Sequence, residues 1–150
     1  MKRLFLLFML ISLSVYADDC IFDEKAYLKF IQKYSAENNN STIKNDGETL
    51  LVNRNNESIL VKGGGCNHLG VSIEVKTKQA YTERQFLQKV LSLSREFGNW
   101  LINTRELKNS IEKGKYQIIN NVYYIKVDAM TVFTASNEKP GEINIDFYIN

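Results

Sequence analysis

The sequence predicts an α+β domain, in which helices pack on one face of an antiparallel sheet. Apolar residues recur every three or four positions in two long stretches, and every second position in several shorter ones. The two kinds of stretch are grouped: a helix precedes three strands, and helices precede three or four more strands. We therefore expect a single domain with one antiparallel sheet of about six strands. An N-terminal helix and a central helical segment should cover one face of it.

The first helix is expected over residues 23–37, where the sequence is DEKAYLKFIQKYSAE. Tyr27 and Ile31 belong to an apolar series at helical spacing, and Asp23 is a residue type that caps helix N-termini. A polar loop is expected to follow over residues 38–48. The N-terminal helix is therefore predicted to be amphipathic, with one side facing the sheet.

The central helical segment has clear start and stop signals. Thr82 is followed three positions later by Gln85, the spacing of a capping box. The apolar stripe that begins there meets Gly98, which can interrupt a helix. A second helical piece is expected from Thr104 and should end near Gly114, because glycine is favoured just after a helix. We expect two consecutive helices here.

The strands are predicted from alternation and from turn residues. Residues 49–53 and 58–62 flank an Asn-rich turn, as in a β-hairpin, and residues 70–77 alternate apolar with polar side chains. In the C-terminal part, Asn120 and Asn121 separate two further β-rich runs. Residues 143–150 alternate without a break. This alternation is typical of strands with one buried and one exposed face.

The N-terminus has the pattern of a secretory signal peptide. Lys2 and Arg3 precede an apolar run over residues 4–13, and Ala17 provides a small residue before an acidic pair. An uncleaved membrane anchor is the alternative, but spanning a bilayer takes about 20 apolar residues. A lipid attached at Cys20 would require small residues before it, which the acidic pair does not provide. We expect cleavage after Ala17.

Cleavage would leave residues 18–150 as a single α+β domain in the bacterial periplasm or outside the cell, without a stable membrane anchor. The whole chain has 19 Lys and Arg residues and 17 Asp and Glu residues. Removal of Lys2 and Arg3 would leave 17 of each sign. A neutral protein lacks the positive field that holds nucleic acid, so nucleic acid is not an expected partner.

Cys20 and Cys66 are the only cysteines, and in an oxidising compartment such a pair is expected to form a disulfide. The alternative is a catalytic pair of Cys66 and His68, the only histidine. A nucleophile must be a free thiol, and its base usually comes from elsewhere in the fold. Zinc needs three or four ligands, which these residues do not supply. We expect no metal, no cofactor and no catalytic residues.

A run of glycines, Gly63, Gly64 and Gly65, leads into Cys66. Such a run weakens a strand, so it indicates positive φ angles, a bulge or a close approach by another part of the chain. We expect a turn anchored by the disulfide, which would present Gly63, Gly64, Gly65, Asn67 and His68 to a partner.

Tyrosines gather in the predicted C-terminal strands, and tyrosine is enriched at protein interfaces. Tyr123, Tyr124 and Tyr148 are the candidates for a partner-binding surface, if they share the exposed face of the sheet. Ordinary strand composition is the alternative explanation. Motifs for a serine nucleophile elbow, a zinc-binding helix or a nucleotide loop are not found in the sequence.

In layout the chain is similar to small periplasmic inhibitors and immunity proteins of bacteria, which are exported, single-domain and disulfide-bearing. The similarity covers the order of features and no motif residues. It implies a non-enzymatic protein that blocks a protein partner, such as a toxin or a cell-wall hydrolase. A small-ligand carrier with an apolar pocket between helices and sheet is the alternative. An envelope enzyme that uses Cys66 and His68 is a third hypothesis.

Overall fold

The computed structural model describes residues 22–64, 69–128, 131–137 and 140–149. The first half of the chain forms helix α1 (Glu24–Glu37) and strands β1 (Ser41–Ile43), β2 (Thr49–Arg54), β3 (Glu57–Gly63) and β4 (Leu69–Thr77). The second half forms helices α2 (Glu83–Phe97) and α3 (Thr104–Glu112) and strands β5 (Tyr116–Ile119), β6 (Val122–Lys126), β7 (Thr131–Ser136) and β8 (Glu142–Ile149). In each half of the chain, therefore, the helices come first and four strands follow.

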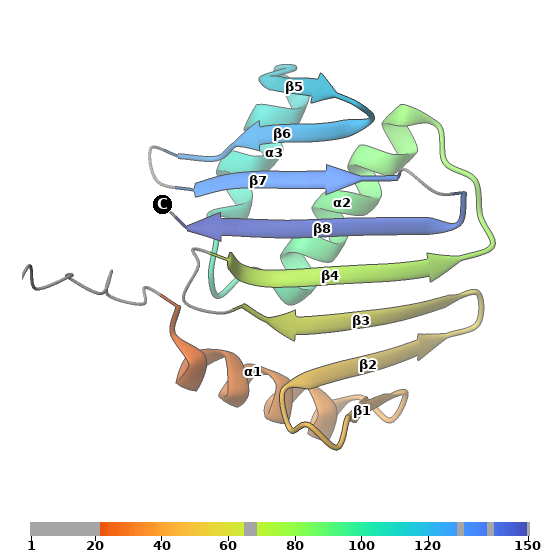
Figure 1. Ribbon diagram of the computed structural model, residues 1–150, viewed down its shortest axis with the longest axis vertical. Helices are drawn as coiled ribbons and strands as arrows, with labels where there is room; N and C mark the ends of the chain where they lie inside the picture. The colour runs from red at the N-terminus through yellow and green to blue at the C-terminus, as the bar shows by residue number, and fades with distance from the viewer. Residues whose placement is uncertain (1–21, 65–68, 129–130, 138–139, 150) are drawn as a thin grey trace, which may run out of the picture.

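All eight strands form one antiparallel sheet in the order β1-β2-β3-β4-β8-β7-β6-β5 (Figure 1). Within each half, consecutive strands pair with one another, and the halves join through β4 and β8 at the centre. The two halves thus repeat one topology about the β4–β8 pair. No repeat is evident in the sequence, because this symmetry lies in the pairing order and not in matching residues.

The three helices pack on the same face of the sheet. Tyr34 of α1 lies against Phe97 at the end of α2, with ring centroids 5.3 Å apart. Trp100, just after α2, has its ring 6.2 Å from that of Phe30 and 6.0 Å from that of Tyr27 on α1. These contacts hold α1 beside the C-terminal end of α2.

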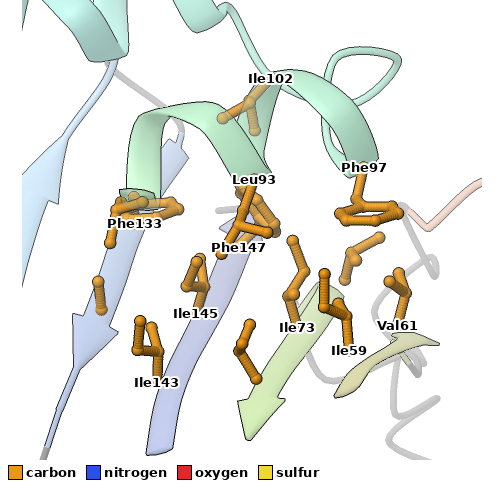
Figure 2. Packing of buried hydrophobic residues seen from close by; sticks show 14 of the residues in the cluster. Ile59, Val61, Ile73, Leu93, Phe97, Ile102, Phe133, Ile143, Ile145 and Phe147 are labelled. Atoms are coloured by element: carbon orange, nitrogen blue, oxygen red, sulfur yellow. The ribbon is translucent and has the colours of Figure 1, made fainter. Parts of the chain in front are cut away.

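The core lies between the helices and the sheet. Figure 2 shows Leu93 and Phe97 of α2 directed toward the strand residues Ile73 and Phe147. The alternation predicted for residues 143–150 is confirmed by the burial of Ile143, Ile145 and Phe147. Burial of large aliphatic and aromatic side chains contributes about 1.5–3 kcal/mol each, so this layer dominates the stability of the fold.

The predicted α+β class, the single domain and the antiparallel sheet are confirmed, but the sheet has eight strands and not about six. Strand β1 lies in residues 38–48, which were expected to be a polar loop. With only three residues, β1 is too short to show alternation in the sequence. The expectation of three or four C-terminal strands is met with four.

The helix boundaries follow their predicted caps. The Asp23 carboxylate accepts a hydrogen bond of 2.9 Å from the Ala26 N–H, and Thr82 and Gln85 form the expected capping box. Gly98 ends α2. A Cβ at Gly98 would lie 2.8 Å from the Phe147 ring, so the core leaves no room there for a side chain.

The other face of the sheet is covered by no helix of the described chain. We call it the open face. Residues opposite one another in an antiparallel pair share a face, so the strand register assigns its members. They form a polar centre with apolar or aromatic residues on either side, and include Leu51, Leu60, Ser72, Glu74, Asn144, Asp146, Tyr148, Thr134, Tyr124, Val122 and Ile119.

Candidate functional site

The candidate site consists of the glycine segment at the end of β3 and the tyrosines of the C-terminal strands. Of the predicted loop, the structure describes Gly63 and Gly64. The Gly64 N–H donates to the Gly70 carbonyl at 2.9 Å, which continues the β3–β4 hairpin beyond its last strand pair. Gly65, Cys66, Asn67 and His68, like Cys20, lie outside the described residues.

Glycine is needed at position 63 because the ring of Tyr27 lies very close to its backbone, and not because of its backbone angles. Its φ is not among the positive φ values of the described glycines, which occur at Gly47, Gly114 and Gly141. A Cβ at Gly63 would lie 2.7 Å from two atoms of the Tyr27 ring and 3.1 Å from Cζ of Phe22. A side chain here would displace α1, so this glycine allows the helix to pack against the end of β3.

Phe22 brings the start of the described chain next to the glycine segment. Its ring lies 5.9 Å from that of Tyr27 and 6.3 Å from that of Trp100, and it contacts the position of Gly63. Phe22 is two residues after Cys20, and Gly63 is three residues before Cys66. This proximity supports the predicted disulfide, which remains a prediction because both cysteines lie outside the described residues.

The three candidate tyrosines lie on two different faces. Tyr123 is 9% exposed on the helix-covered face, with its ring centroid 5.1 Å from that of Phe86. Tyr124 and Tyr148 lie on the open face. Tyr123 and Tyr124 separate because successive residues of a strand point to opposite faces. The structure therefore assigns Tyr123 to the core, away from the surface shared by the other two.

Tyr124 and Tyr148 belong to a partly apolar region of the open face. Tyr124 is 39% exposed, and Ile119 of the neighbouring β5 is 50% exposed. Burial, followed by the charge of Asp146 and the proximity of Tyr124, raises the pKa of Tyr148 above its usual value. This region offers aromatic contact area and hydroxyl groups for hydrogen bonds.

A surface cleft of about 450 Å³ lies beside Tyr124, where β5 begins. We call it the β5 cleft. Its lining residues are Gly114, Lys115, Tyr116, Gln117, Tyr124 and Lys126. It therefore combines two aromatic rings with two lysines, and no Asp or Glu is among its lining residues.

Sequence reasoning missed the exposed isoleucines of β5. Ile118 and Ile119 are each 50% exposed, and together with Tyr124 they are the exposed large hydrophobic residues of the described chain. A signal was present: two adjacent isoleucines in a strand cannot both face the core, because the side chains alternate. By the same alternation, Tyr123 points to the same face as the buried Ile125, and Tyr124 points to the other face.

Several carboxylates of the described chain make hydrogen bonds or ion pairs with neighbouring side chains. Glu57 at the start of β3 accepts hydrogen bonds from Tyr81 at 3.1 Å and from Lys89 at 2.6 Å. Glu74 on the open face is 3.4 Å from Lys76. Among the residues that the structure describes, no group of three or more His, Cys, Asp or Glu side chains is placed to hold a metal ion.

Two further surface clefts lie elsewhere. One of about 610 Å³ lies near the end of β4 and includes Thr77, Tyr81 and Gly141, and another of about 480 Å³ lies along α2. Neither these nor the β5 cleft lies between the helices and the sheet. Of the helices within the described residues, none has the length and hydrophobicity needed to cross a bilayer.

The chain was compared with protein-family models, with curated proteins and with solved structures. None of the three comparisons gives a match.

Proposed function

We propose that this protein is an exported, non-enzymatic inhibitor or immunity protein of the bacterial periplasm, which blocks a toxin or a cell-wall hydrolase by binding to it. The observation that carries the proposal is the open face. The helices gather on one side of an eight-stranded sheet, and the other side carries Tyr124, Tyr148 and Ile119 uncovered by any described helix.

The chemistry of this face suits a protein partner. Tyrosine combines a large contact area with a hydroxyl group and is common among the residues that dominate binding energy. The strands beneath Tyr124 and Tyr148 are held by pairing on both sides and by the core on the opposite face. A rigid surface loses little conformational entropy on binding, which favours tight occlusion of a partner's cleft.

A small-ligand carrier remains the second candidate, and it would need a cavity between helices and sheet. That space is filled by a continuous cluster of buried side chains, which includes Phe86, Phe97, Phe133 and Phe147. The clefts described above open on the surface. These observations favour a binding surface over an internal ligand pocket.

The proposal can be tested with the tagged mature protein, residues 18–150, as bait in periplasmic extracts and in secretions of competing bacteria. A captured protein supports the proposal only if its toxic or hydrolytic activity falls to background at an equimolar amount of the bait. The Y124A and Y148A variants should bind it at least about tenfold more weakly, as expected for interface tyrosines.

The matched control is Ser72→Ala, a small polar change at the centre of the same open face. It should leave binding within about twofold, because truncating a small side chain outside the main contacts changes little. Co-purification of a small molecule, with no protein whose activity is blocked, would favour the carrier. Equal loss of binding in Ser72→Ala and Y124A would contradict the assigned surface.

A further inference from the structure

The two edges of the sheet differ in how they are protected. At the β1 edge, the Ser41 N–H and hydroxyl donate to the Asn38 carbonyl at 3.1 and 2.7 Å, and Ile43 packs against the core beside α1. At the β5 edge, the described chain makes no backbone hydrogen bond to residues 116–119 apart from the ladder with β6. Every second residue of an edge strand points its N–H and C=O outward, so β5 can accept another strand.

The side chains of β5 do not discourage such pairing. Natural edge strands commonly carry a charge or a proline that prevents association, whereas β5 has the sequence Tyr-Gln-Ile-Ile. Ile118 and Ile119 are half-exposed and point to opposite faces. A strand placed along β5 would cover apolar area on both faces of the sheet.

The lysines beside β5 indicate the charge of that strand. Lys115 and Lys126 line the same cleft, and extending the β5–β6 register by one residue places them opposite each other. Like charges directly opposite on neighbouring strands are destabilising. The cleft lining contains no carboxylate to offset them. An incoming acidic side chain would be attracted to both lysines and would offset the repulsion between them.

We infer that β5 receives an extended acidic segment of the protein partner, which adds as a ninth strand and places a carboxylate beside Lys115 at the β5 cleft, which Lys126 also lines. The inference rests on the proposed function for the identity of the partner as a protein. It adds the chemistry that the partner presents: alternating apolar and acidic side chains in an extended backbone. Strand addition supplies backbone hydrogen bonds, and the β5 cleft supplies selectivity for negative charge.

The test uses a fluorescein-labelled peptide of about ten residues that alternates Val and Glu, and a counterpart that alternates Val and Lys. Fluorescence anisotropy with the mature protein should show binding of the acidic peptide at about 0.05 M NaCl, weakened about tenfold at about 0.5 M NaCl by screening. Hydrogen exchange should slow, when the peptide binds, at the amides of β5 whose N–H groups point away from β6. No binding, or unchanged exchange in β5, would overturn the inference.

Two variants distinguish binding at the β5 cleft from a general effect of the protein's net charge on peptide binding. The double variant K115E/K126E should lose binding of the acidic peptide by at least about tenfold, since attraction becomes repulsion. The control K25E/K29E makes the same change in net charge on the exposed side of α1 and should bind as the wild type does. Equal losses in the two variants, or equal binding of the two peptides, would overturn the inference.

Two further measurements distinguish other outcomes. If the wild type forms dimers that Ile119→Ser dissociates, β5 pairs with a second copy and the acidic-segment inference is wrong. If a captured toxin is neutralised by K115E/K126E but not by Y148A, the proposed function stands and the inference fails. If the acidic peptide behaves as expected but no protein is neutralised, the inference stands and the proposed function fails.

Discussion

The Tyr27 ring lies so close to Gly63 that a Cβ at this glycine would be 2.7 Å from two of the ring atoms. This contact joins the first helix to the end of β3, immediately before the segment that leads to Cys66. Tyr27 is 1% exposed, so its ring is enclosed by the rest of the fold. The glycine at position 63 is therefore a requirement of packing.

Gly63→Ala should lower the free energy of unfolding by about 1–3 kcal/mol, the cost of inserting a methyl group into a packed site. Urea denaturation followed by the fluorescence of Trp100, the only tryptophan, measures this directly, because its ring lies 6.0 Å from that of Tyr27. Lys62→Ala, an exposed neighbour on the same strand, is the control and should change stability by less than about 0.5 kcal/mol. Equal stability of G63A and wild type would show that α1 moves aside without cost.

Removing the Tyr27 hydroxyl should also destabilise the protein. This hydroxyl lies 2.6 Å from the Glu48 carbonyl oxygen and 3.0 Å from the Val61 carbonyl oxygen, and so connects α1 to β3 and to the residue just before β2. Tyr27→Phe should lower the free energy of unfolding by about 1–3 kcal/mol, because the one O–H group that the two carbonyl oxygens share as a donor is lost. Tyr116→Phe is the matched control, since its hydrogen bond to Glu83 is exposed. A smaller loss for Tyr27→Phe than for the control would contradict this role.

The raised pKa of Tyr34 predicts that the protein loses stability at alkaline pH. Burial, together with the hydrogen bond and charge of Glu96, raises the pKa of Tyr34 to about 12, and the hydroxyl donates to Glu96 at 2.5 Å. Arg54 also pairs with Glu96, so three elements meet at this carboxylate. A tyrosine in an unfolded chain has a pKa of about 10.

Because the folded-state pKa is the higher one, the contribution of Tyr34 is complete below pH of about 10 and is lost as pH rises toward 12. Urea unfolding at a series of pH values should show that Tyr34→Phe loses less stability over this interval than the wild type. Both proteins should show the same pH dependence between about pH 7 and 9. Parallel curves above pH 10 would mean that Glu96 does not hold the neutral phenol.

The proposed disulfide between Cys20 and Cys66 predicts that the mature protein has no free thiol. A thiol assay in denaturant should be negative, and mass spectrometry after proteolysis should find the two cysteine peptides joined. Reduction should lower the free energy of unfolding by about 2–5 kcal/mol. The C20A/C66A double variant should match the reduced protein. Two titratable thiols in the oxidised mature protein would contradict the disulfide and revive the Cys66–His68 hypothesis.

The sequence predicted the helices well because their caps are local. Thr82 and Gln85 are three residues apart, and the hydrogen bonds they form involve only that turn. Strand β1 was missed because its three residues are fixed by pairing with β2 and by packing against α1, which are contacts distant in sequence. The packing reason for Gly63 depends on Tyr27, 36 positions away in the chain. Local patterns therefore define elements, while the surface and its close contacts arise from tertiary packing.

The β5–β6 turn differs from the β2–β3 turn in its backbone angles, although both contain two asparagines. Asn120 and Asn121 have φ values of 51° and 62°, so both lie in the left-handed region, as a type I′ turn requires. Asn55 and Asn56 are not among the described residues with positive φ. Glycine adopts positive φ without steric cost, so substitution should have opposite effects in the two turns.

Asn121→Gly should raise the free energy of unfolding by up to about 1 kcal/mol. Position 121 has a left-handed backbone conformation, which costs less for glycine than for a residue with a side chain. Asn56→Gly should lower it by about 0.5–1 kcal/mol, because there glycine adds only conformational entropy to the unfolded chain. Urea denaturation of both variants measures the difference. The same sign of change in both would contradict the turn assignment. Because the turn holds the β5 edge, Asn121→Gly should also preserve binding of the acidic peptide, which anisotropy can check.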